Sequence, residues 1–176
     1  WVMEARTEEE QKKRIATLFD LNNIRNNNIA ALTRLKELQQ SDGSWAWYKG
    51  MNGSRFITNF IVELNARLAL LTGKPLEGDA LTMQRSAFSF LNKEALEEYK
   101  NIRKAEKNGE KVKGLSDEAL KYLYLVAISG EKMPLADNQT AYNYFLSKVG
   151  ETLTSRSMTN KALAAIVLDK AGRKQE

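Results

Sequence analysis

Residues 39–48 read Gln-Gln-Ser-Asp-Gly-Ser-Trp-Ala-Trp-Tyr and lie between two segments with helical periodicity. Asp42-Gly43 is typical of a turn, because glycine adopts positive φ without steric cost and aspartate accepts hydrogen bonds from nearby backbone. Trp45 and Trp47 then follow where a loop is ordinarily polar. We interpret the two rings as plugs that close the end of a helix pair, and the alternative interpretation is a platform on which a ligand stacks.

About seven segments carry the apolar spacing of a helix, and none alternates as a strand would. They lie near residues 7–21, 29–38, 57–72, 78–92, 116–128, 137–149 and 157–171. A charged stretch, 93–107, either continues the fourth helix or pairs with it. Short turns join the segments, so neighbouring helices are expected to form antiparallel hairpins. We predict an all-α fold with one helical domain over residues 1–176.

Most of these helices have an expected buried face. In the first helix it is Ile15, Leu18 and Phe19, and in the third it is Ile57, Phe60, Ile61, Leu64, Leu68 and Leu71. In the last helix it is Met158, Ala162, Ala165, Ile166 and Val167. Residues 120–128 are apolar on almost every side, which is typical of a helix surrounded by others. The asparagine-rich segment 22–28 is expected to be a connection.

Several residues favour the ends of these helices. Serine and aspartate accept hydrogen bonds from the free N–H groups of a first turn, and glycine favours the residue after a last turn. The expected N-caps are Ser54, Ser116, either Ser155 or Ser157, and the aspartates Asp79, Asp117 and Asp137. Gly73 is the expected C-cap of the third helix.

Composition excludes several classes of function. The 176 residues contain no cysteine and no histidine, which rules out a thiol nucleophile, a Ser-His pair and a zinc site built on sulfur or imidazole. The net charge of +5 is spread among acidic residues, so a nucleic-acid-binding stripe is not expected. No segment is long and apolar enough to span a membrane. Because the chain begins Trp-Val-Met, we expect it to be a piece of a longer protein.

Two carboxylates are candidates for acid–base chemistry. They are Asp42 and Glu63, and a carbohydrate-active enzyme would need them to face each other across a cleft. The simpler interpretation makes Asp42 a turn residue and Glu63 the i,i+4 partner of Arg67. Capping likewise accounts for Ser54, although a helix start of this kind also binds anions. We predict no catalytic residue, cofactor or metal site in this chain.

The candidate site residues fall into two groups around the aromatic turn. The first group is a structural turn motif made of Gln39, Asp42, Gly43, Trp45 and Trp47. The second is an exposed docking loop made of Tyr48, Lys49, Met51, Asn52 and Ser54. Gln39, Gly43 and Trp45 together resemble the Gln-x-x-x-Gly-x-Trp repeat of α/α-toroid proteins, in which rings of inner and outer helices pair into a barrel.

Longer stretches resemble one family within that fold, the bacterial alpha-2-macroglobulin-like proteins of Bacteroides-type bacteria. The matching stretches are residues 1–5, 10–16, 18–22, 38–47, 57–63, 115–117 and 120–124. The resemblance implies that the chain is part of an α/α-toroid, the thioester domain of a large extracytoplasmic protease trap. Its implied partners are proteases and neighbouring domains of the same protein.

In that family, cleavage of a bait region changes the protein's shape, and many members then capture the protease through an internal Cys–Gln thioester. The thioester motif Cys-x-Glu-Gln is absent here, since no cysteine precedes Glu10-Gln11. In the family this motif opens the domain, upstream of the region that this chain resembles. The resemblance therefore leaves two alternatives: the parent protein carries the motif ahead of Trp1, or it lacks the motif, as some bacterial members do. The resemblance therefore implies a scaffold role without turnover. A helical interaction module that traps no protease and, less favoured, a carbohydrate-active toroid enzyme stay open as alternatives.

Overall fold

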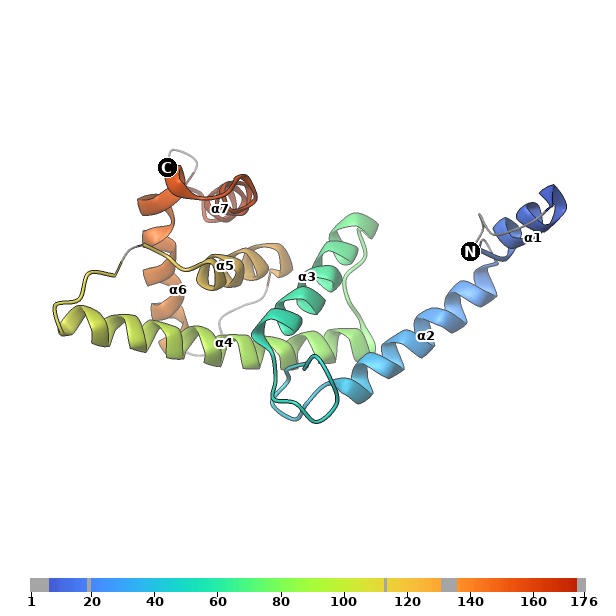
Figure 1. Ribbon diagram of the computed structural model, residues 1–176, viewed down its shortest axis with the longest axis horizontal. Helices are drawn as coiled ribbons and strands as arrows, with labels where there is room; N and C mark the ends of the chain where they lie inside the picture. The colour runs from blue at the N-terminus through green and yellow to red at the C-terminus, as the bar shows by residue number, and fades with distance from the viewer. Residues whose placement is uncertain (1–6, 19, 113, 131–135, 174–176) are drawn as a thin grey trace. The chain divides into compact units, whose positions relative to one another are not determined.

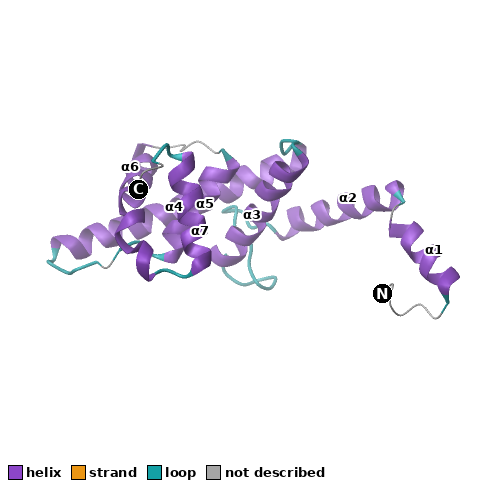
Figure 2. Cartoon of the chain, turned by 90° about the horizontal axis from the view of Figure 1, so that it is seen from above, coloured by secondary structure: helices purple, strands orange, loops and turns teal. Residues whose placement is uncertain are grey.

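The computed structural model describes residues 7–18, 20–112, 114–130 and 136–173, and this part of the chain is helical without strands (Figures 1 and 2). Its α-helices are α1 (Glu8–Leu18), α2 (Leu21–Leu38), α3 (Arg55–Thr72), α4 (Gly78–Lys107), α5 (Asp117–Ser129), α6 (Ala136–Lys148) and α7 (Met158–Lys170). A 3-10 helix, Val149–Ser155, follows α6. The predicted all-α class with about seven helices is confirmed.

Two compact units make up the chain, Trp1–Leu38 and Gln39–Glu176. In the first unit, α2 begins at Leu21, so the predicted connection over residues 22–28 is wrong. Asp20 explains the early start, because its carboxylate accepts a hydrogen bond from the Asn22 N–H at 3.0 Å, as an N-cap does. Ile15 was expected to be buried but is exposed. Phe19 and the Leu18 side chain lie outside what the structure describes.

The second unit is a stack of helical hairpins in two layers. In one layer α5 packs between α3 and α7, and in the other α4 packs against α6. The layers are joined because α3 also packs on α4, and α5 on α4 and α6. The charged stretch 93–107 continues α4, which is one helix of 30 residues and therefore about 45 Å long.

The three helices of the α3–α5–α7 layer begin beside one another. Their first turns line one groove, with residues 55–60, 117–121 and 159–163 around it. Each begins with a serine N-cap, as predicted for Ser54 and Ser116 and, of the two alternatives for α7, at Ser157. Their hydroxyl oxygens accept backbone N–H groups three residues on, at 3.3, 2.9 and 3.2 Å.

Of the other predicted helix ends, one is confirmed and three are wrong. Gly73 ends α3 in the left-handed conformation, as expected. The three aspartates, however, are not N-caps: Asp79 and Asp117 lie inside the first turns of α4 and α5. Asp137 likewise lies in the first turn of α6. A carboxylate in the first turn still stabilises the helix, because it lies near the positive end of the helix dipole.

The centre of the second unit is α5, whose predicted burial is confirmed. Leu120, Leu123 and Leu125 are fully buried, as is the ring of Tyr122. The phenol has a partner, because Tyr122 donates to the Asn92 side-chain oxygen at 2.7 Å. Burial raises the pKa of Tyr122, so the phenol stays neutral over the physiological range.

The outer helices of this layer, α3 and α7, contradict the predicted buried faces. Phe60, Leu64, Leu68 and Leu71 on α3 are exposed, while Thr58, Asn59, Val62 and Ala66 are buried in their place. On α7, Met158, Ala162, Ala165 and Ile166 are exposed, and Val167 alone of the predicted set is buried. Within the layer, each of these helices packs mainly on α5, and the large apolar side chains named above lie open.

Candidate functional site

The turn between residues 39 and 54 is held by the side chain of Gln39. Its amide nitrogen donates to the Gly43 carbonyl within the turn and to the Met83 carbonyl on α4, both at 2.9 Å. One side chain thus closes the turn and fastens it to α4. Gln40 adds a second hydrogen bond across the turn: its side-chain amide nitrogen donates to the Met51 carbonyl at 2.6 Å.

Asp42 and Gly43 shape the tip of the turn. The Asp42 carboxylate accepts the Ser44 N–H at 2.9 Å and the Ser44 hydroxyl at 2.6 Å. Gly43 has a φ of +91°, and a Cβ added there would lie 1.9 Å from the Ser86 carbonyl oxygen on α4. Both the backbone conformation and the close approach to α4 therefore require glycine.

Trp45 is buried, with 2% of its surface exposed. Its backbone joins the turn to α3, because its N–H donates to the Thr58 hydroxyl at 3.0 Å and its carbonyl accepts the Ser54 N–H at 2.8 Å. The ring of Trp45 is therefore interior, and its backbone fastens the turn to the start of α3.

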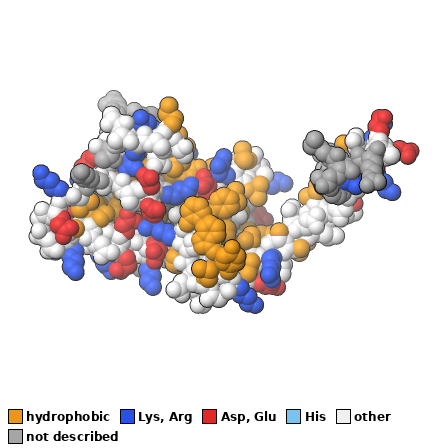
Figure 3. Space-filling model, viewed as in Figure 1, with side chains coloured by type: hydrophobic (Ala, Val, Ile, Leu, Met, Phe, Trp, Pro, Cys, Tyr) orange, Lys and Arg blue, Asp and Glu red, His pale blue; other side chains and the backbone are white. Residues whose placement is uncertain are grey.

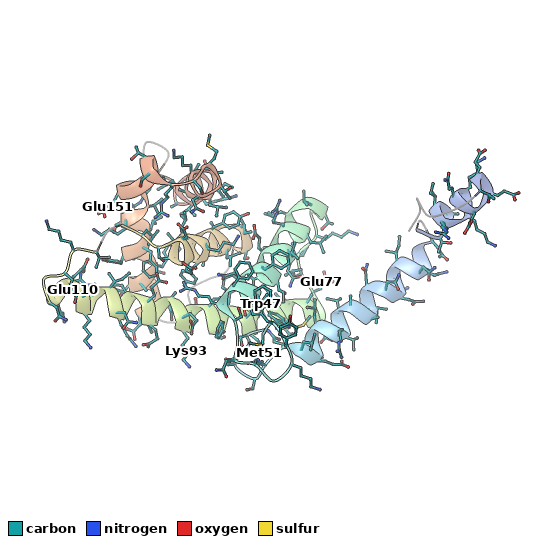
Figure 4. The ribbon with its side chains drawn as sticks, viewed as in Figure 1. Trp47, Met51, Glu77, Lys93, Glu110 and Glu151 are labelled. Carbon is teal, nitrogen blue, oxygen red and sulfur yellow. The ribbon has the colours of Figure 1, made fainter. Side chains whose placement is uncertain are left out.

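Trp47 is not a plug, contrary to the prediction. Its side chain is 58% exposed, and its ring stacks on Phe56 of α3 with 5.6 Å between centroids and 7° between planes. Tyr48 and Met51 of the predicted docking loop are also exposed, and Trp47 and Met51 lie on the loop beside the start of α3 (Figure 4). Lys49 and Asn52 are exposed, and Ser54 is the partly buried cap of α3.

An exposed apolar surface extends from this loop along α3. Figure 3 shows hydrophobic side chains gathered over α3 and the preceding turn. We call five of them the α3 face: Phe56, Phe60, Leu64, Leu68 and Leu71, with exposed fractions of 51–84%. A soluble monomer rarely leaves such a contiguous apolar area open, so this surface is the main candidate for binding a partner.

Charged groups border this surface at the groove where α3, α5 and α7 begin, a cavity of about 320 Å³. Arg55 binds Glu98 of α4 at 2.7 Å, and both side chains are mostly buried. Glu63 binds Lys121 of α5 and, at 3.6 Å, Arg67. Sequence spacing indicated the Glu63–Arg67 pair but not the bonds to Glu98 and Lys121, which join residues far apart along the chain.

The two candidate catalytic carboxylates have structural partners. Asp42 is engaged by Ser44, and Glu63 by Lys121 and Arg67. The hydrogen bond from the Ser44 hydroxyl, opposed by partial burial and aided by the backbone N–H of Ser44, lowers the pKa of Asp42 below its ordinary value. A lowered pKa suits a permanently ionised turn carboxylate rather than a general acid.

The stabilising effect of the Asp42 charge is expected to depend on pH. A folded-state pKa below the ordinary 3.8 gives stability above that pH, and this stability is lost as pH falls through the lower folded value. Asp42→Asn should therefore cost about 1 kcal/mol in urea unfolding at pH 7. The difference from wild type should shrink below about pH 3. Glu110→Gln, at an exposed loop residue, controls for net charge; a pH-independent cost would contradict the assignment.

Comparison with protein-family models, curated proteins and solved structures finds no significant match to this chain. Among the described residues, no helix is long and apolar enough to cross a bilayer. The same residues hold no group of three or more carboxylates placed to bind a metal ion.

Proposed function

We propose that this chain is a non-catalytic scaffold, part of an α/α-toroid in an alpha-2-macroglobulin-like protease trap of the bacterial envelope. The observation that carries the proposal is the arrangement of the hairpins. In one layer α5 packs between α3 and α7, and the first turns of these three helices line one groove, while α4 and α6 pack together in the other layer. In a toroid, successive helices along the chain belong alternately to the inner and the outer ring, as they belong alternately to the two layers here.

The turn contacts support the same proposal. Gln39, Gly43 and Trp45 stand at the toroid spacing, and Gln39 holds the turn against α4 while the Trp45 ring is buried. The sequence stretches that resemble the family, such as 57–63 and 120–124, fall on α3 and α5. In this proposal the chain has a structural role, because the ionisable residue of the turn, Asp42, is bonded to Ser44 within the turn.

Covalent capture of a protease tests the proposal in the protein at its natural full length. The protein is incubated with proteases of different specificity, with and without prior methylamine, which attacks a thioester carbonyl to form an amide and release the thiol. We expect a mass gain of one methylamine and a denaturant-resistant protease adduct that methylamine prevents. A protein that is cleaved without retaining the protease, covalently or otherwise, would overturn the trap.

A second candidate function is a helical interaction module that traps no protease. The open α3 face and the stacked Trp47 and Phe56 rings favour it, because exposed aromatic side chains often anchor protein partners. Trp47→Ala distinguishes the two candidates. In a module it should weaken partner binding strongly, whereas in a trap it should leave protease capture intact.

A further inference from the structure

Three buried polar atoms distinguish the groove where α3, α5 and α7 begin. They are Nε and Nη2 of Arg55 and Oδ1 of Asn59, which form no hydrogen bond with any residue that the structure describes. Both residues line the groove, and Asn59 is only 6% exposed. An unpaired buried donor or acceptor costs free energy, so folded proteins usually supply a partner for each one. The three atoms therefore point to a ligand that enters the groove.

The unpaired atoms of Arg55 match a carboxylate. The third nitrogen, Nη1, is already bonded to Glu98 of α4 at 2.7 Å. Nε and Nη2 lie on one edge of the planar guanidinium and present two parallel N–H donors. Such a fork fits the two oxygens of one carboxylate group, with one N–H directed to each oxygen.

Asn59 supplies a hydrogen-bond acceptor beside this fork. It follows Arg55 by four residues and so lies one turn further along the same side of α3. Its Oδ1 atom needs an N–H or O–H donor, which a bare carboxylate lacks. The last residue of a peptide carries both groups, because its amide N–H and its carboxylate are attached to the same carbon. Arg55 and Asn59 together therefore match the end of a peptide.

The remaining walls of the groove suit an apolar side chain. Phe56 and Phe60 line it from α3, and Leu163 lines it from α7. Its volume of about 320 Å³ is at the lower end of the range for ligand pockets, about 300–1,000 Å³. The groove can therefore hold the end of a chain but not a long segment.

The electrostatics of the groove favour a negative group. The first turns of three helices line it, and the positive end of each helix dipole attracts an anion. Of the acidic residues around it, Glu63 is paired with Lys121. Asp117 is paired with Arg156 at 2.8 Å. Glu118 is exposed, so solvent and salt screen its charge.

We propose that this groove binds the carboxyl-terminal end of a peptide, that is, a carboxylate with an acylated amine on the neighbouring carbon. The carboxylate pairs with Nε and Nη2 of Arg55, and the last amide N–H donates to Oδ1 of Asn59. The last side chain packs against Phe56 and Phe60. The groove lies across α3, α5 and α7, so the site does not depend on what covers the outer faces of the layer. It does not rest on protease trapping either.

Titration of the full chain with two short peptides tests the proposal. The probe is acetyl-Ala-Ala-Leu with a free carboxylate, and its matched control is the same peptide with a carboxamide end. Heteronuclear NMR follows the backbone amides and the Nε–H signal of Arg55. We expect the acid to shift signals of residues 55–60, 117–121 and 159–163. It should bind about tenfold or more tightly than the amide, which lacks the charge-assisted hydrogen bonds.

Acetyl-leucine identifies the source of the carboxylate, because it carries both anchoring groups without the preceding residues. Tighter binding of the tripeptide would indicate the end of a peptide chain. Equal binding would indicate a small acylated amino acid that uses the same two contacts.

Two variants assign the contacts. Arg55→Lys keeps the charge beside Glu98 but removes the planar fork, so the acid should bind about tenfold more weakly. Arg85→Lys makes the same exchange at an exposed residue of α4 and is the matched control. Asn59→Leu should also weaken binding. Its free energy of unfolding in urea should stay the same or rise, because an unpaired buried oxygen is replaced by an apolar group.

Several results would overturn the proposal. One is a wild-type chain that binds neither peptide, or binds the acid and the amide equally. Another is wild-type affinity in Arg55→Lys. A large loss of stability in Asn59→Leu with unchanged binding would show that Asn59 serves the fold, for example through an internal water. Circular dichroism checks folding, and if Arg55→Lys fails to fold, the peptide pair and Asn59→Leu still decide. No measurement involves a protease, so failure here is distinct from failure of the trap.

Discussion

Trp45→Ala is expected to lower the free energy of unfolding of the Gln39–Glu176 unit by about 3–5 kcal/mol, the usual cost of removing a buried aromatic ring. The side chain is 2% exposed beside the start of α3, so its loss leaves a cavity that the surrounding helices cannot fill without moving. Urea unfolding followed by circular dichroism at 222 nm measures the change.

Trp47→Ala is the matched control, since it removes the same side chain two residues away. Its ring is 58% exposed and contacts Phe56 by stacking, so the expected cost is about 1 kcal/mol or less. Equal losses of stability in the two variants would contradict the division into one interior and one surface tryptophan. A small effect at Trp45 alone would mean that the turn is not part of the folded core.

Gly43→Ala is expected to destabilise the same unit by about 3 kcal/mol, for two reasons that add. A left-handed backbone costs a residue with a Cβ about 1–2 kcal/mol, and the φ here is +91°. The new methyl group would also lie 1.9 Å from the Ser86 carbonyl oxygen, so the turn must move away from α4 at a further cost of about 1–3 kcal/mol.

Gly50→Ala separates these two contributions. Gly50 has nearly the same φ, +88°, but no atom lies within 4 Å of an added Cβ. Its expected cost is therefore the backbone part alone, about 1–2 kcal/mol. The difference between the two variants in urea unfolding measures how closely the turn packs on α4. If both variants lost the same stability, the close approach of Gly43 to Ser86 would be wrong.

Features that depend on neighbouring residues in the sequence were predictable. Ser54 and Ser116 cap α3 and α5 as expected, because a cap needs only its own hydroxyl and the N–H groups of the next turn. Gly73 ends α3 for an equally local reason. The buried α5 was predictable because it is apolar on almost every side, so no choice of face had to be made.

The faces of the two outer helices of the layer were not predictable. The pattern of α3 indicates one large apolar stripe, and such a stripe usually turns toward the core. Here the core side is instead filled by Thr58, Val62 and Ala66, whose small side chains line the packed side of the helix. Which face is buried depends on where α4 and α5 lie, and these helices are distant in sequence.

The sequence by itself determined the all-helical class, the serine caps of α3 and α5 and the central place of α5, because hydrogen bonding and apolar content act within a few residues. The tertiary structure alone decided that Trp45 is interior and Trp47 exposed, that Gln39 holds α4, and that Arg55 and Lys121 bind carboxylates on other helices. These contacts join residues 13 to 58 positions apart or depend on which side of a turn faces the core. The spacing of residues within one helix carries no information about contacts between helices. The packing of the hairpins alone determines which of these residues meet.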